Sequence, residues 1–190
     1  GKAKAGQQGI IDIQLVHSRD GRNWQRCSDR SPVIPVGPYD YDKGMIFGTC
    51  NTPVIMGDEM WIYYSASTDI HCGSGPDKKV SIGRAAWRLD GMVSLQAGEK
   101  EGIVETVAFI PQGNSLEVNA DLGNGQLLVE VLDENRKVIT GYGKHKCLPL
   151  KGTGICQQVN WKNLKTLPRQ KPIRLRFYLL QSNLFSYSIK

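Results

Sequence analysis

The chain has no apolar run long enough to cross a membrane as a helix. None of its runs approaches the roughly 20 residues that a membrane-spanning helix needs. No segment between its glycines and prolines keeps a long helical period, which argues against a helical protein. The first ten residues lack the apolar core of a signal peptide, so we expect a chain that is mature, truncated or not exported.

Cysteines are few, and their spacing matches no metal-binding pattern. The five cysteines, at positions 27, 50, 72, 147 and 156, contain no CxxC motif. We therefore predict no metal site and no cofactor. The pairs Cys50–Cys72 and Cys147–Cys156 could form disulfides in an exported protein, and the alternative is buried free thiols.

Positive charge is in excess but is not concentrated. The chain has 24 Lys and Arg against 18 Asp and Glu, for a formal net charge of +6. Near the C-terminus, Arg174 and Arg176 alternate with Ile173, Leu175 and Phe177, which is typical of the wet face of a half-buried strand. A nucleic-acid groove would require clustered basic residues interleaved with aromatic ones. We therefore expect no nucleic-acid partner.

What the sequence does contain is a series of short strands. Its 21 glycines and 9 prolines separate runs rich in Val, Ile, Tyr, Phe and Trp, such as "EMWIYYSAS" (59–67), "QLLVEVLD" (126–133) and "IRLRFYLL" (173–180). Turns such as "RLDGM" (88–92) and "LGNGQ" (122–126) supply residues that tolerate positive φ. The pattern predicts an all-β protein.

One turn, "SRDGRNW" (18–24), has an explicit local mechanism. The side chains of Ser18 and Asp20 can bond the backbone of their own turn, and Gly21 supplies a left-handed φ. Trp24 then begins the return strand, and we expect its side chain to pack inward.

The order of motifs resembles the end of a five-bladed β-propeller. "SRDGRNWQR", "YDKGMIFGT", "GDEMWIYYSAS" and "IGRAAWRLDGMVSL" follow one another as in glycoside hydrolase family 32-like and family 43-like proteins, of the levanase, invertase and arabinosidase type. The sequence after residue 97, from "GIVETVAF" onward, resembles the antiparallel β-sandwich often appended to such propellers. The resemblance implies about one and a half blades over residues 10–97 and a sandwich over residues 98–190. Residues 1–9 are expected to be disordered or a cloning remnant.

This resemblance implies the C-terminal portion of a glycoside hydrolase that acts on a carbohydrate, either outside the cell or in the periplasm. Hydrolysis needs two carboxylates, and the resemblance assigns these mostly to earlier blades, so this chain alone is expected to be inactive. Its apolar edges would be covered by the upstream blades or by a second copy. The sandwich would brace the propeller. The alternatives are a carbohydrate-binding module and a structural, oligomerising β-protein.

Four residues are candidates for sugar contact. The resemblance places Asp42 near the propeller channel, with Tyr41 beside it to stack on a sugar ring. A carboxylate can accept bonds from two sugar hydroxyls, but Asp42 could equally cap a turn. The resemblance also places His71 at the channel together with Asp69, and a solvated or structural role is the alternative for this histidine.

The aromatic strand "EMWIYYSAS" also bears on the site. Glu59 directly follows a Gly-Asp turn, so we expect it to be solvated and not to act as a general acid. Trp61 and Tyr63 share one face of the strand and Tyr64 takes the other. We expect all three aromatic side chains to lie in the core.

Overall fold

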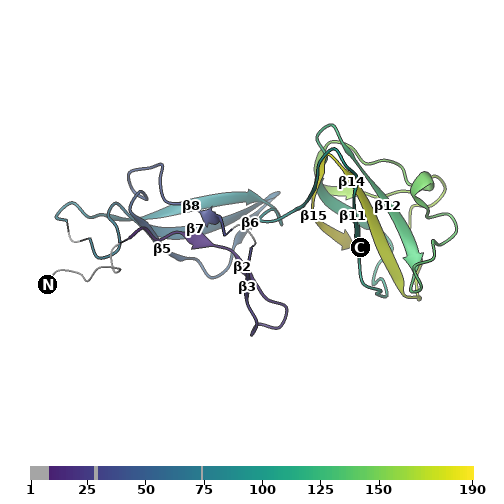
Figure 1. The fold of residues 1–190 in the computed structure, drawn as a ribbon, viewed down its shortest axis with the longest axis horizontal. Coiled ribbons are helices and arrows are strands. Elements are labelled where there is room, and N and C mark those ends of the chain that lie inside the picture. Colours follow the sequence, from purple (N-terminus) through teal and green to yellow (C-terminus); the bar gives the residue numbers. More distant parts are fainter. Residues whose placement is uncertain (1–8, 28–29, 74) are drawn as a thin grey trace. The chain divides into compact units, whose positions relative to one another are not determined.

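The computed structural model describes residues 9–27, 30–73 and 75–190. Within these ranges the chain forms β-strands, one short 3₁₀ helix and no α-helix, so the all-β prediction is confirmed (Figure 1). The expectation for residues 1–9 falls, apart from Gly9, outside the described residues. No helix in the described part of the chain is long and apolar enough to cross a membrane.

The chain divides into two compact units, Gly1–Leu89 and Asp90–Lys190. The boundary expected from the sequence lies eight residues further on, between residues 97 and 98. The reason is strand β9 (Leu95–Ala97), which pairs with β15 (Ser182–Ile189) and so belongs to a sheet of the second unit. Ala97 is itself buried in the core of that unit.

The first unit is built on one antiparallel sheet. Its central strand, β7, pairs along its whole length with β8 and, on the opposite side, with β5 and then β6. The four strands are β5 (Met45–Thr49), β6 (Val54–Met56), β7 (Glu59–Ser67) and β8 (Val80–Arg88). One face of this sheet buries Ile46, Tyr64 and Ala66 against Ile34.

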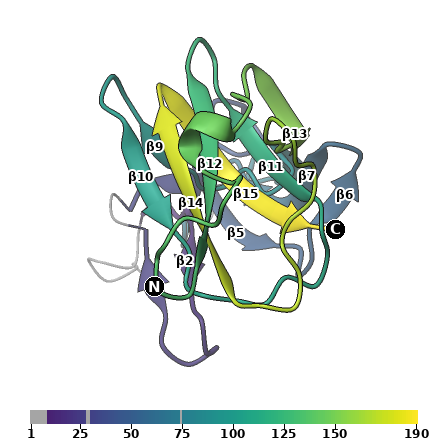
Figure 2. The same cartoon turned by 90° about the vertical axis from the view of Figure 1, so that its right-hand side faces the viewer.

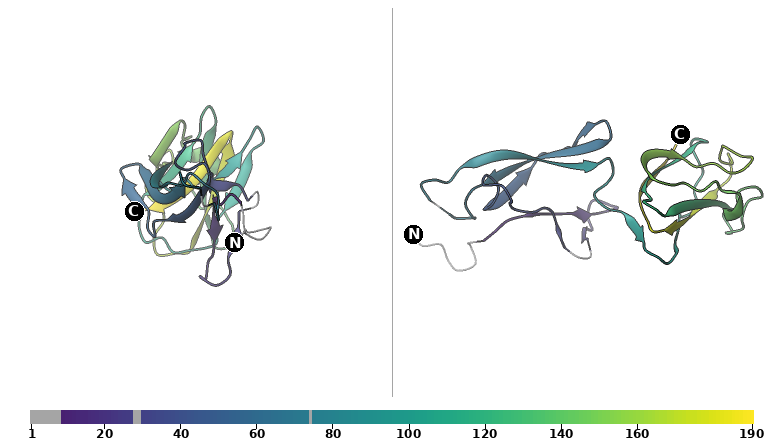
Figure 3. Two further views of the ribbon diagram at one scale, coloured as in Figure 1. Left: turned by 90° about the vertical axis from the view of Figure 1, so that its left-hand side faces the viewer. Right: turned by 90° about the horizontal axis from the view of Figure 1, so that it is seen from above.

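Two short strand pairs complete the first unit. They are β1 (Ile13–Gln14) with β4 (Pro32–Ile34), and β2 (Val16–His17) with β3 (Gln25–Arg26). Ile34 of β4 carries the β1–β4 pair into the core, whereas the β2–β3 hairpin projects away from the sheet (Figures 1 and 3).

Two expectations for aromatic residues of the first unit are wrong. Trp24, at the end of the "SRDGRNW" turn, is 61% exposed, because its hairpin projects from the sheet instead of lying on it. Of the three aromatic residues of β7, only Tyr64 is buried, while Tyr63 is exposed and Trp61 half-buried. Trp61 and Tyr63 share the face of β7 opposite to the core, where Arg84 of β8 lies over the Trp61 ring, 4.1 Å from its centroid.

The second unit contains two antiparallel sheets (Figure 2). One has the order β13-β11-β15-β9 and the other β10-β14-β12. The strands not yet given are β10 (Gly102–Glu105), β11 (Leu116–Asp121), β12 (Gln126–Asp133), β13 (Thr153–Gln158) and β14 (Ile173–Leu180), and the 3₁₀ helix is η1 (Lys144–Lys146). The predicted strands 126–133 and 173–180 coincide with β12 and β14.

A single apolar core lies in the second unit, and both of its sheets contribute to it. Alternate residues of β11, β12 and β14 are buried there, as the alternation of apolar and polar residues predicts. Trp161 is 2% exposed, and its indole Nε1 donates a hydrogen bond to the Val129 carbonyl over 2.9 Å.

All five cysteines of the chain are free thiols, so neither predicted disulfide pair is formed.

Candidate functional site

A polar cavity of about 530 Å³ opens on the first unit. It is lined by the loop before β5, the loop between β7 and β8, and the start of β8. Two of the four predicted residues, Tyr41 and Asp69, line this cavity. The other lining residues are Asp40, Lys43, Thr68, Gly75, Pro76, Asp77, Lys78, Lys79 and Ser81.

Tyr41 is held at the cavity by a chain of hydroxyl groups. The Tyr64 hydroxyl donates to Oδ2 of Asp42 over 2.9 Å, and the Tyr41 and Tyr64 hydroxyl oxygens are 3.3 Å apart. Because the single hydroxyl proton of Tyr64 is donated to Asp42, the Tyr41 hydroxyl must be the donor in its hydrogen bond with Tyr64. The ring of Tyr41 also stacks on Tyr39, with centroids 5.5 Å apart and planes 6° from parallel.

Asp42 lies behind the cavity wall and not in the cavity. The residue is 1% exposed, and its other carboxylate oxygen, Oδ1, accepts a hydrogen bond from the Tyr39 N–H over 3.2 Å. These contacts correspond to the turn-capping alternative, with Tyr64 as an additional partner. Burial, followed by the bonds to Tyr41 and Asp42, raises the pKa of Tyr64 well above its usual range. This phenol therefore stays protonated, and Asp42 acts on the cavity through Tyr64 and Tyr41.

Asp69 is fixed by its own loop. Its Oδ1 accepts from the Ile70 N–H over 2.9 Å and its Oδ2 from the Gly75 N–H over 3.4 Å. Its backbone packs so closely on Gly44 that a Cβ at position 44 would overlap it. The carboxylate thereby has a set direction before any ligand arrives, which reduces the entropy lost on binding.

His71 is not brought to the cavity. Its side chain is exposed, its backbone N–H donates to the Gly9 carbonyl over 3.1 Å, and its Nδ1 lies 3.3 Å from the Cys72 thiol. The predicted set of four therefore divides into Tyr41 and Asp69 at the cavity, Asp42 behind it and His71 outside it. Glu59 is exposed as expected, and it accepts a bond from the Trp61 indole over 2.6 Å.

The lysines of the cavity were not among the residues predicted from the sequence. Lys43 pairs with Asp40 over 3.1 Å, and the Lys78 ammonium donates to the Gly73 carbonyl over 3.0 Å. The sequence feature that indicates these lysines is the "DKK" run (77–79). Two hydrogen bonds hold this run next to the end of β7: the Thr68 N–H donates to the Lys79 carbonyl, and the Lys79 N–H donates to the Thr68 hydroxyl. With three lysines and three aspartates, the wall offers both donors and acceptors next to a tyrosine ring.

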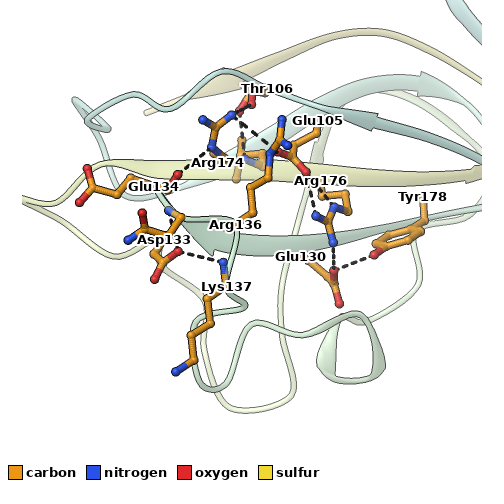
Figure 4. A network of polar contacts seen from close by, with 12 residues as sticks. Glu105, Thr106, Glu130, Asp133, Glu134, Arg136, Lys137, Arg174, Arg176 and Tyr178 are labelled. Carbon is orange, nitrogen blue, oxygen red and sulfur yellow. Dashed lines mark hydrogen bonds and ion pairs between the residues drawn. The ribbon is translucent and has the colours of Figure 1, made fainter.

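A second polar cluster lies on the outer face of the β10-β14-β12 sheet (Figure 4). Arg176 donates to Glu105 over 2.8 Å and to Glu130 over 3.4 Å, and the Tyr178 hydroxyl donates to Glu130 over 2.7 Å. Arg136 and Arg174 also pair with Glu105. The Arg176 guanidinium lowers the pKa of Glu105. Because the carboxylates are already saturated by internal partners, this cluster is suited to holding three strands together and not to catalysis.

No family model, curated protein or solved structure matches the chain. Within the described ranges, no group of three or more His, Cys, Asp or Glu side chains is arranged to hold a metal ion.

Proposed function

We propose that the first unit provides one wall of a carbohydrate-binding cleft in a glycoside-hydrolase-like β-propeller. The observation that carries this proposal is the convergence of Tyr41 and Asp69 on one polar cavity. A tyrosine ring can stack on the apolar face of a sugar, and neighbouring carboxylates and ammonium groups can pair with its hydroxyls. In this proposal the propeller part corresponds to the sheet of β5 to β8, and hydrolysis depends on carboxylates of other blades.

The second unit has the role of a β-sandwich that braces the propeller. Its two sheets bury one core between them, and its largest aromatic side chain, Trp161, lies inside that core. A sugar-binding sandwich would instead need exposed aromatic rings in a plane. The proposal includes a location outside the cytoplasm, which follows from the resemblance alone.

A panel of neutral polysaccharides (arabinan, levan, inulin and xylan), titrated against the full chain by calorimetry, tests the carbohydrate site. We expect Tyr41→Ala to weaken binding of the recognised glycan about tenfold or more, equivalent to about 1.4 kcal/mol, because the stacking surface is lost. Tyr63→Ala is the matched control, since Tyr63 lies on the face of β7 opposite to the Tyr64 cluster. Absence of binding to every glycan, or an equal loss in both variants, would contradict the proposal.

A second candidate, an oligomerising β-protein, is favoured by the apolar side chains that the first unit leaves exposed. Val80 and Ile82 of β8 are 64% and 77% exposed, and all three residues of β6 are exposed. Among the described strands, β8 pairs only with β7 and leaves its other edge open. Further propeller blades or a second copy of the chain would cover such an edge.

A further inference from the structure

The β2–β3 hairpin is a rigid projection that the proposed carbohydrate cleft does not use. Its turn is fixed by Asp20, which accepts hydrogen bonds from the Arg22 and Asn23 N–H groups, both over 2.8 Å, and from the Asn23 side chain over 2.6 Å. The Ser18 hydroxyl donates to the same carboxylate over 2.9 Å, and Gly21 takes φ +70°. These bonds lower the pKa of Asp20 well below its usual range, and each of its two carboxylate oxygens accepts at least one bond within the turn.

One face of this hairpin combines an indole ring with a guanidinium. Trp24 directly precedes β3, two residues before Arg26. From the alternation of an extended chain we infer that the two side chains leave the same face, about 7 Å apart along the chain. Val16 is paired with Arg26 across the hairpin and shares that face. Nη1 of Arg26 donates to Oε1 of Gln14 over 2.5 Å, which orients the guanidinium. Trp24 is 61% exposed.

The hairpin is also positively charged. Residues 16–26 contain Arg19, Arg22 and Arg26 against one acidic residue, Asp20, whose oxygens are occupied by the turn. None of the ion pairs between described residues involves these three arginines. The opposite face holds a hollow of about 200 Å³, which is lined by His17, Ser18, Arg19, Asp20, Asn23 and Gln25. The charge of the projection is therefore available to an anionic ligand.

We propose that this hairpin binds an acidic glycan, with the Trp24 indole against a sugar ring and the Arg26 guanidinium on its carboxylate or sulfate group. This site is separate from the proposed cleft at Tyr41 and takes a different class of glycan, so the proposal goes beyond the proposed carbohydrate function. A guanidinium binds carboxylates and sulfates through two parallel bonds, and the indole supplies flat apolar area beside it. A lipid surface fits less well, because only Trp24 and Val16 supply apolar area on this face and membrane affinity scales with that area.

The test uses the full chain and three polysaccharides of defined charge. These are polygalacturonate for the carboxylate, dextran sulfate for the sulfate and unmodified dextran as the neutral reference. We expect one of the two polyanions to bind and dextran not to compete. Trp24→Ala and Arg26→Gln should each weaken that binding about tenfold or more. Arg26→Lys should recover part of it at most, because an ammonium cannot form the two parallel bonds.

Two controls separate this site from general electrostatic attraction and from the cleft at Tyr41. Arg169→Gln removes the same charge from an exposed position of the second unit, and it should leave polyanion affinity within twofold. Tyr41→Ala should also leave it unchanged, so the two proposals can fail separately. The hairpin proposal is overturned by equal losses in Arg26→Gln and Arg169→Gln, by no loss in Trp24→Ala, or by no polyanion binding. It is also overturned if single-stranded DNA or phosphatidylserine vesicles bind as tightly as the polyanion.

Discussion

Gly44 stands where the loop before β5 meets the loop after β7. A Cβ at this position would overlap the backbone of Asp69, whereas a Cβ at Gly48, in the same strand region, would meet nothing within 4 Å. Glycine is therefore required at position 44 for space and at position 48 for neither space nor backbone conformation. This close approach is to the backbone of Asp69, whose side chain lines the cavity.

Replacing Gly44 by alanine should therefore lower the free energy of unfolding by about 2–3 kcal/mol, because backbone cannot yield as a flexible side chain can. Urea denaturation monitored by circular dichroism measures this loss. Gly48→Ala is the control and should change the free energy of unfolding by less than about 1 kcal/mol. Similar values for the two variants would show that the loops adjust to the added methyl group.

At the residue scale, the sequence predicted chemistry better than it predicted exposure. The bonds of Ser18 and Asp20 within their turn and the left-handed Gly21 are found as expected, since they involve neighbours in the chain. The exposure of Trp24 was not predictable from its neighbours, because it depends on whether distant strands cover the hairpin. Asp42 shows the same limit: its partner Tyr64 is 22 positions away.

Among the elements, β10, β12 and β14 are joined by charge as well as by backbone bonds. Alternation along 173–180 correctly separated the inward residues from Arg174 and Arg176. The alternation could not show that Arg176 pairs with Glu105, which lies 71 positions away in the sequence. Arg174 and Arg176 were expected to face water. The two carboxylates at the centre of the cluster, Glu105 and Glu130, retain only 18% and 11% of their side-chain exposure.

The cluster makes the stability of the second unit dependent on pH. The folded state lowers the pKa of Glu105, so its carboxylate stabilises the fold above the pKa of the unfolded chain, about 4.5. That contribution is lost as the pH falls through the lowered, folded-state pKa. We expect Glu105→Gln to lower the melting temperature at pH 7. The difference in melting temperature between pH 7 and pH 3 should be smaller in this variant than in the wild type.

Melting curves of the wild type and of Glu105→Gln between pH 3 and pH 7 measure this effect. Glu134→Gln is the matched control, because the Glu134 side chain is exposed and only its backbone carbonyl joins the cluster. Parallel pH profiles for the wild type and Glu105→Gln would contradict the assignment of a stabilising role to this carboxylate.

For the whole molecule, the sequence correctly predicted the all-β class. The chain divides into two units after residue 89, whereas the sequence pattern changes character near residue 97. Turn residues and β-branched runs are local signals, so strands such as β14 were found at their observed bounds. The pairing of β9 with β15 joins Leu95 to Leu184, and no local pattern indicates such a pairing. The uncovered side chains of β8 are likewise a property of the assembled sheet.

The open edge of the first unit should make the protein self-associate. We expect light scattering to give a mass above that of the 21.1 kDa chain at micromolar concentrations, and Ile82→Lys to return it to the monomer. The introduced charge opposes strand pairing and costs little in the folded monomer, since Ile82 is already 77% exposed. Val107→Lys, at a 79% exposed position of the second unit, should leave the mass unchanged. A monomeric wild type would argue against the oligomerising candidate.

The burial of Trp161 and the exposure of Trp24 have an optical consequence. Trp161 has its indole bonded inside the core of the second unit, whereas Trp24 is exposed at the end of the hairpin turn of the first unit. Their emission should differ in wavelength, and iodide in solution can reach the second but not the first. Trp61 and Trp87 of the first unit are half-buried and add their own emission, so a ligand seated on the hairpin would show itself as a smaller fraction of the total emission that iodide can quench.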